Sequence, residues 1–90
     1  MDLGLDGDAA LVSASSSGLG KASATALAAE GANVAINGRD PDRLEAAVAD
    51  VDAAGTGEVI GLRGDLTEPA AVERLVDRTV ETFGGLDHLV

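Results

Sequence analysis

Short apolar runs alternate with longer amphipathic segments along the chain. The runs are rich in Val, Ile, Leu and Ala, which favours β-strands, whereas the longer segments repeat apolar residues at the spacing of an α-helix. The predicted strands cover residues 8–13, 33–37, 58–62 and 86–90, and the predicted helices cover residues 18–30, 41–54 and 67–83.

Residues at the ends of the segments support these limits. Gly31 and Gly55 follow the first two predicted helices, in the position where a helix often ends on a residue without a side chain. Asp40 is a good N-terminal cap, and Pro41 suits the first helical position because an N–H has no helical partner there. The second helix therefore has a defined start and a defined end.

The third predicted helix opens at Thr67 and ends before two consecutive glycines. Val72, Leu75, Val76 and Phe83 are expected to form one apolar stripe on it. Strands that alternate with helices predict parallel strands joined by right-handed crossovers, in the order β-α-β-α-β-α-β of a doubly wound α/β sheet. Because a buried parallel strand is an unusual end for such a sheet, these 90 residues are expected to be the N-terminal part of a single larger domain.

The composition limits the classes of protein to consider. Ninety residues, 46% of them hydrophobic, suffice for one small folded unit. The absence of cysteine excludes disulfides and cysteine-based metal sites, and it suits a reducing compartment. The N-terminus has no basic segment followed by an apolar one, and no apolar run reaches membrane-spanning length. A soluble cytoplasmic protein with no metal site is expected.

The chain is strongly acidic. Sixteen Asp and Glu residues against six Lys and Arg residues give a net charge of −10, which repels nucleic acids and anionic membranes. Neither is therefore expected as a partner. Two explanations of the charge stay open: an ordinary acidic surface, or a salt-adapted surface whose self-repulsion is screened by salt.

Small residues fill the junction between the first strand and the first helix, from Ser13 to Gly20. They allow a tight turn, and they let a phosphate group approach the free N–H groups at the helix N-terminus. Gly20 would allow the helix to pack closely on the strand. A plain tight turn is the structural alternative, since the serines at positions 15–17 are common turn formers.

Two phosphate-binding motifs do not fit this junction. A P-loop requires G-x-x-x-x-G-K-[ST], but Ser15 replaces its first glycine and Ala22 replaces its hydroxyl residue. The strict dinucleotide pattern G-x-G-x-x-G is also absent.

A third pattern fits better. Residues 13–20 resemble the T-G-x-x-x-G-x-G motif of the short-chain dehydrogenase/reductase family. Ser13 stands for the threonine, Gly18 and Gly20 match the last two glycines, and Ala14 replaces the first.

The resemblance extends over the whole chain. Residues 37–39 (Asn-Gly-Arg) follow the second strand, where the family binds the adenosine ribose, and residues 65–66 (Asp-Leu) follow the third, beside the adenine ring. Residues 86–90 look like the strand that leads into the family's Asn-Asn-Ala-Gly motif. The resemblance implies a Rossmann-like fold that binds a dinucleotide cofactor. The residues that it assigns to the cofactor are Ser13, Ser15, Ser16, Ser17, Gly18, Leu19, Gly20, Asn37, Arg39, Asp65 and Leu66.

The residues after the second strand favour NADP over NAD. In dinucleotide-binding folds an acid there binds the ribose 2′-hydroxyl of NAD, whereas an arginine accommodates the 2′-phosphate of NADP. This chain has Gly38 in the position of the acid, followed by Arg39, whose guanidinium suits a phosphate. Ser17 occupies the position in which many NADP-dependent members of the family have a second basic residue. Two alternatives stay open: Arg39 as a solvated arginine before a helix cap, and Asp65 as a loop carboxylate without a ligand.

The family's catalytic set is missing from these residues. The family transfers a hydride between nicotinamide and a carbonyl or alcohol with a Ser, a Tyr and a Lys, assisted by an Asn. This chain has no tyrosine, and its only lysine is Lys21 in the cofactor loop. His88, in a predicted strand, is expected to be a packed or edge histidine, and Asp87 is expected to fix the end of that strand.

Two hypotheses follow. In the first, the chain is the cofactor-binding portion of an NADP-preferring oxidoreductase, similar to 3-oxoacyl-carrier-protein reductases. Such an enzyme acts on a small carbonyl or alcohol substrate and forms homo-oligomers through helices outside this segment. In the second, the chain is a nucleotide-binding or interaction module without catalysis. The sequence of the gene past Val90 separates the two.

Overall fold

The predicted alternation of strands and helices is present in the computed structural model, which describes residues 6–13 and 18–90. The described strands form one parallel sheet in the order β3-β2-β1-β4, which confirms the doubly wound α/β arrangement. The strands are β1 (Ala9–Val12), β2 (Asn33–Gly38), β3 (Val59–Arg63) and β4 (His88–Leu89), and the helices are α1 (Gly18–Ala29), α2 (Pro41–Asp52) and α3 (Ala71–Phe83).

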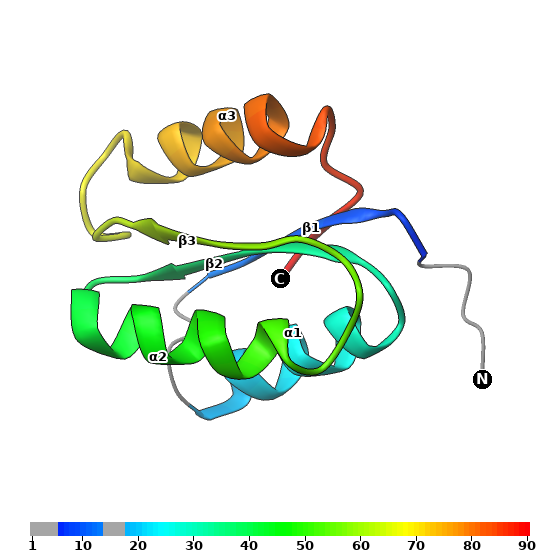
Figure 1. Cartoon of the computed structure of the whole chain (residues 1–90). Helices are drawn as coiled ribbons and strands as arrows, with labels where there is room; N and C mark the ends of the chain where they lie inside the picture. The colour runs from blue at the N-terminus through cyan, green and yellow to red at the C-terminus, as the bar shows by residue number, and fades with distance from the viewer. Residues whose placement is uncertain (1–5, 14–17) are drawn as a thin grey trace.

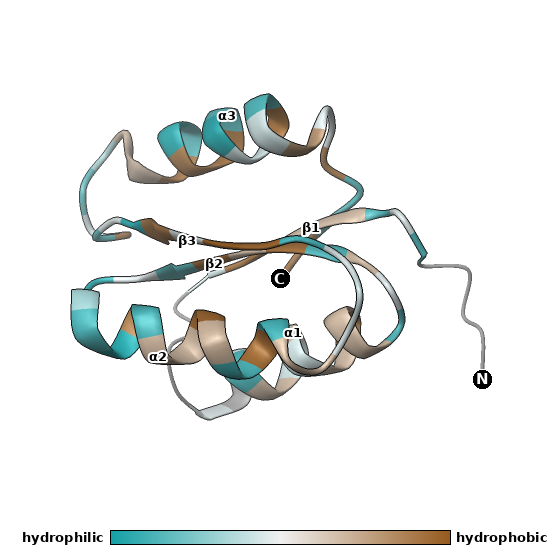
Figure 2. Ribbon diagram, viewed as in Figure 1, coloured by the Kyte–Doolittle hydropathy of each residue, from teal (hydrophilic) through white to brown (hydrophobic). Residues whose placement is uncertain are grey.

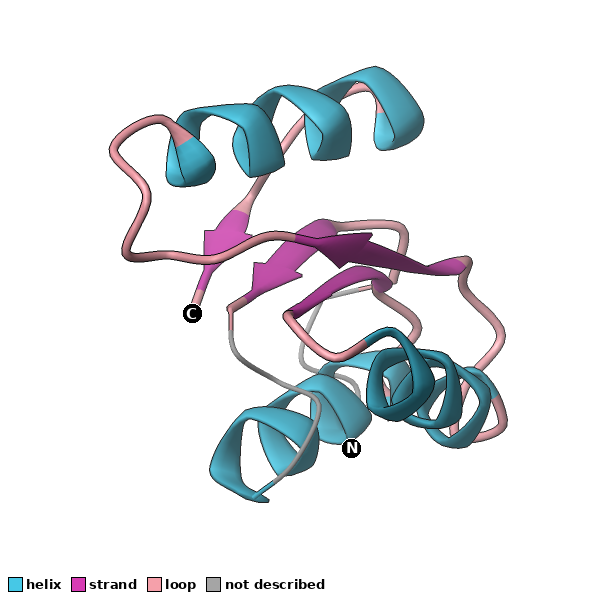
Figure 3. Ribbon diagram, turned by 90° about the vertical axis from the view of Figure 1, so that its left-hand side faces the viewer, coloured by secondary structure: helices cyan, strands magenta, loops and turns pink. Residues whose placement is uncertain are grey.

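The helices cover the two faces of the sheet unequally. Helices α1 and α2 lie together on one face, and α3 lies alone on the other (Figures 1 and 3). A strand followed by a helix and a parallel neighbouring strand gives this layering, because right-handed crossovers place consecutive helices on one face until the strand order reverses. The reversal occurs after β3, since β4 pairs with the far side of β1.

Alternation along the strands divides the core into two layers. Val12, Val34 and Ile36 point toward α1 and α2, while Leu11 and Ala35 point toward α3. These residues are almost completely buried, so β1 and β2 are apolar on both faces, as parallel strands covered by helices require. Figure 2 shows hydrophobic colour in the middle of the sheet and hydrophilic colour on the side of α3 that faces away from it.

Glycines after α2 let the loop to β3 pass close to the backbone at the end of α1. A side chain at Gly55 would overlap the carbonyl group of Ala28, and one at Gly57 would overlap that of Ala32. Gly31 follows α1 with a φ of 90° and donates its N–H to the Ala28 carbonyl at 2.9 Å, as predicted for a helix end. The prediction that Gly55 ends α2 is wrong by a few residues, because α2 already ends at Asp52.

The start of α3 was predicted wrongly. The helix begins at Ala71 rather than at Thr67, because Asp65 holds Thr67 in a turn through its side chain. The predicted stripe is also wrong in part. Leu75 is buried and Val76 and Phe83 pack against the core, but Val72 is 49% exposed, one residue out of phase with buried Ala71.

The chain end is tied to β1 by polar contacts. Asp87 accepts a hydrogen bond from the Ala9 N–H at 2.8 Å and donates its own N–H to the Ala9 carbonyl, which confirms its role at the strand end. The His88 Nε2 lies 2.9 Å from the Asp8 carboxylate at the sheet edge, so this histidine is a packed edge residue, as predicted. Within residues 6–13 and 18–90 no helix has the length and apolar character needed to cross a bilayer.

Candidate functional site

The predicted cofactor residues follow the carboxyl ends of β1, β2 and β3, which meet at one edge of the parallel sheet. The strand order reverses between β1 and β4, because the chain runs outward from β1 to β3 and then returns to the far side of β1. In open α/β sheets this reversal point is where ligands bind. The topology therefore gathers residues that lie far apart in the sequence.

The end of β1 is fixed to the end of the described chain. Ser13 donates both its N–H and its hydroxyl to the Val90 carbonyl, each at 3.0 Å. Gly18, with a φ of 63°, then begins α1, and Gly20 lies half-buried in its first turn. The predicted cofactor residues Ser15, Ser16 and Ser17 lie outside the described residues, and of Leu19 only the helical backbone is described.

Asn37 holds the end of β3 rather than facing the surface. Its side chain is 1% exposed, and its Nδ2 donates to the carbonyls of Leu62 and Gly64 at 3.1 and 3.2 Å. A buried amide that joins a strand to the loop after its neighbour fixes the path of that loop. The sequence placed Asn37 among the cofactor residues, and the structure gives its side chain a positioning contact.

Arg39 and Asp65 meet across the ends of β2 and β3. The Nη1 of Arg39 lies 3.6 Å from the Oδ2 of Asp65, and the side chains are 74% and 35% exposed. Such an exposed, loosely spaced pair contributes little to stability and separates readily. The structure therefore brings these two predicted residues together while leaving most of the guanidinium accessible.

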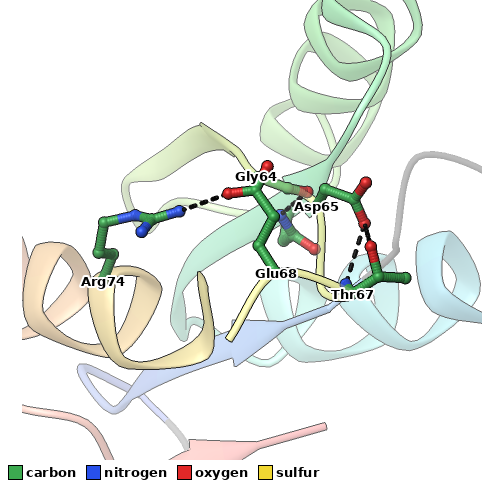
Figure 4. A network of polar contacts seen from close by, with 6 residues as sticks. Gly64, Asp65, Thr67, Glu68 and Arg74 are labelled. Carbon is green, nitrogen blue, oxygen red and sulfur yellow. Dashed lines mark hydrogen bonds and ion pairs between the residues drawn. The ribbon is translucent and has the colours of Figure 1, made fainter. Parts of the chain in front are cut away.

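A turn closed by its own side chain orients Asp65. The Oδ1 of Asp65 accepts hydrogen bonds from the N–H and the hydroxyl of Thr67, at 2.9 and 2.7 Å (Figure 4). These bonds from Thr67, with a smaller contribution from nearby Arg39, lower the pKa of Asp65 below its ordinary value. Asp65 is therefore a carboxylate at neutral pH and a hydrogen-bond acceptor for a ligand.

A shallow hollow lies between the loops that leave β2 and β3. Leu66, next to Asp65, is 38% exposed and adds apolar surface beside it. Glu68 is engaged by Arg74 at 3.2 Å (Figure 4), which neutralises that acid. The hollow is lined by Arg39, Arg63, Gly64, Asp65 and Glu68.

These groups fit the adenosine end of a dinucleotide. Asp65 presents an acceptor for an amino group, Leu66 an apolar surface for a ring, and Arg39 a cation for a phosphate. Gly38, in the position of the acid that holds a free ribose hydroxyl in NAD-binding folds, has no side chain to oppose a phosphate. This fit concerns the adenosine half alone, because residues 14–17, part of the loop predicted to bind the pyrophosphate, lie outside the described residues.

The one lysine points away from this hollow. Lys21 forms an ion pair with Asp50 and so joins α1 to α2. This ion pair was not predicted, because the two residues are 29 positions apart in the sequence.

A family model described as short chain dehydrogenase matches residues 8–90. The chain belongs to the short-chain dehydrogenase family. The matched span contains every strand and helix of the fold as well as the hollow described above.

Known relatives share the fold and differ in what they act on. The chain is 38% identical over 88 residues to the (2S)-[(R)-hydroxy(phenyl)methyl]succinyl-CoA dehydrogenase subunit BbsD of Thauera aromatica, with 98% of this chain and 35% of that protein covered. It is 38% identical over 87 residues to the L-rhamnose 1-dehydrogenase (NAD(P)(+)) of Sphingomonas sp. strain SKA58, with coverages of 96% and 34%.

Solved structures show the same arrangement. The L-sorbose reductase of Gluconobacter frateurii, complexed with NADPH and L-sorbose, superposes with a TM-score of 0.91 at 35% identity, over 99% of this chain and 34% of that one. The chain thus spans about a third of the length of each of these three proteins.

Two contributors to the site escaped the sequence analysis. Thr67 was taken for the first residue of a helix, although the order Asp-x-Thr is a recognisable side-chain turn. Arg63 was not singled out, because its place beside Arg39 depends on the pairing of β2 with β3. Only the register of β2 against β3, which pairs Gly38 with Arg63, identifies Arg63 as a neighbour of Arg39.

Proposed function

We propose that the chain is the cofactor-binding portion of an NADP-preferring oxidoreductase. The observation that supports this most is the end of β2, where a glycine replaces the acid expected for NAD and an exposed arginine follows it. Under this proposal residues 1–90 form the N-terminal part of a single dinucleotide-binding domain.

Each side of the hollow has a separate task in this proposal. Arg39 binds the 2′-phosphate, and it exchanges its loose contact with Asp65 for a charge-assisted bond. Asp65 and Leu66 hold the adenine ring, Asp65 through a carboxylate that Thr67 keeps in place. The N–H groups at the start of α1 face the pyrophosphate, where a helix N-terminus favours negative charge.

The proposed reaction is hydride transfer between nicotinamide and a carbonyl or alcohol. The nicotinamide, when bound, supplies or accepts the hydride. The relative named for a hydroxylated, substituted succinyl-CoA supports a thioester substrate such as a 3-oxoacyl thioester, while the relative named for L-rhamnose supports a wider range. The proton donor and acceptor belong, in this proposal, to residues of the whole protein beyond these 90, since the chain has no tyrosine.

Expression of the complete gene tests this proposal. The full-length protein should oxidise NADPH in the presence of one or more members of a panel of 3-oxoacyl thioesters, ketoses and simple ketones, and should do so more efficiently than it oxidises NADH. If the gene instead ends at Val90 and its product turns over none of these substrates, the chain is a non-catalytic nucleotide-binding module.

A further inference from the structure

A second arginine stands beside Arg39 at the end of the neighbouring strand. Arg63 is the last residue of β3 and pairs in register with Gly38, the last residue of β2. The two strand ends are joined there by the Gly64 N–H, which donates to the Gly38 carbonyl at 3.2 Å. Arg63 therefore lies next to the backbone from which Arg39 departs.

The direction of the Arg63 side chain follows from the strand. A side chain on Gly61 would meet Val48 and Leu44 of α2, whereas Leu62 packs in the core layer under α3. Alternate residues of a strand share a face, so the Arg63 side chain leaves the backbone on the side of Gly61. Because β3 is the edge strand, Arg63 lines the hollow beside Arg39 and also borders a pocket next to α3. The side of Gly61 is the face on which the chain passes from Gly38 through Arg39 to the start of α2.

The charges around the hollow leave Arg63 as an available cation. Asp65 lies beside Arg39 and Glu68 is bound by Arg74, so both acids of the hollow have a positive partner. Among the described residues Arg63 has no ion pair and no side-chain hydrogen bond. Its guanidinium is therefore free to meet an anionic ligand.

We propose that Arg63 is a second ligand of the cofactor's 2′-phosphate and shares with Arg39 the discrimination between NADP and NAD. This inference rests on the proposed function. Ser17 stands where a second basic residue is expected in the glycine loop, and Arg63 supplies the missing positive charge from the neighbouring strand. Two arginines, Arg39 and Arg63, line the hollow together with two acids, and Arg74 from outside the lining neutralises one of those acids, so a dianionic phosphate gains from entering it.

Calorimetric titration of NADP⁺ and NAD⁺ against variants of the full-length protein tests the proposal, because these probes differ only in the 2′-phosphate. Arg63→Gln should weaken NADP⁺ binding about tenfold, the loss of one charge-assisted hydrogen bond, and leave NAD⁺ binding unchanged. Arg63→Lys should recover part of the loss, because it keeps the charge without the planar donor pair. Unchanged NAD⁺ binding also shows that the variant remains folded.

Arg78→Gln is the matched control. Arg78 is another exposed arginine without an ion pair or a side-chain hydrogen bond among the described residues. It lies on α3 and lines the pocket there that Arg63 also borders, but it does not line the hollow beside Arg39. An equal loss of NADP⁺ affinity in both Gln variants would mean a general charge effect and would overturn the proposal.

The outcomes also separate this inference from the proposed function. If Arg39→Ala weakens NADP⁺ and Arg63→Gln does not, the inference is wrong and the NADP preference stands. If the unaltered protein binds NAD⁺ at least as tightly as NADP⁺, the proposed preference fails and the role of Arg63 fails with it.

Discussion

Replacing Asn37 with leucine should loosen the adenosine side of the site without changing its preference between cofactors. The variant keeps the volume of the buried side chain but removes two hydrogen bonds, to the carbonyls of Leu62 and Gly64. Each such bond contributes about 0.5–1.5 kcal/mol, so the free energy of unfolding should fall by about 1–3 kcal/mol. Since the lost bonds hold the loop that leads to Asp65, NADP⁺ and NAD⁺ should both bind more weakly, by the same factor.

Asn33→Leu provides the matched control, because it makes the same replacement at the opposite end of β2. The Asn33 Oδ1 accepts from the Glu58 N–H at 2.9 Å and its Nδ2 donates to the Gly7 carbonyl at 3.5 Å, but both bonds are exposed, so water can replace them. Guanidinium unfolding and cofactor titration of the full-length variants give both quantities. The reasoning is refuted if the two variants lose equal stability, or if Asn37→Leu weakens NADP⁺ alone, which would make the amide a phosphate ligand.

Three further outcomes are expected. Thr67→Val should raise the pKa of Asp65 part of the way to its ordinary value in a carboxyl NMR titration, because the hydroxyl bond is lost and the backbone bond remains. An unchanged Asp65 pKa in this variant would contradict the assignment to Thr67. Because the pKa of Asp65 is lower in the folded protein, its carboxylate stabilises the fold above the pKa of the unfolded carboxyl, and this stabilisation is lost as the pH falls through the folded pKa. The 90-residue chain alone should show no oxidation of NADPH with carbonyl substrates, because it has no tyrosine to exchange the proton, and saturable turnover would disprove this. If the net charge of −10 reflects salt adaptation, the thermal midpoint of the full-length protein should rise as KCl approaches molar concentrations, whereas a constant or falling midpoint assigns the charge to an ordinary acidic surface.

The fold was predictable from the sequence because its signals are local. Asp40 and Pro41 mark the start of α2 within the residues that form it, and Gly84 ends α3 with a φ of 83° as predicted. The start of α3 was missed for an equally local reason, since a threonine that would suit a helix cap is used by a neighbouring aspartate instead.

The sequence predicted those site residues that can be recognised from their own position along the chain. Arg39 and Asp65 were found because each directly follows a strand. Their contact with each other, the inward turn of Asn37 and the place of Arg63 all depend on which strands are neighbours and in what register. Such long-range pairing leaves no mark in the spacing of residues along one chain.

Titration of NADP⁺ and NAD⁺ against the full-length protein and its Arg39→Ala and Gly38→Asp variants tests the central claim most directly. The unaltered protein should prefer NADP⁺, and Arg39→Ala should weaken that binding by about ten- to a hundredfold, the equivalent of one lost charge-assisted hydrogen bond, with NAD⁺ nearly unaffected. Gly38→Asp should shift the preference toward NAD⁺, because the new carboxylate repels the 2′-phosphate and can bind a free ribose hydroxyl. Equal losses of NADP⁺ and NAD⁺ affinity in Arg39→Ala would make the arginine structural and contradict the assignment.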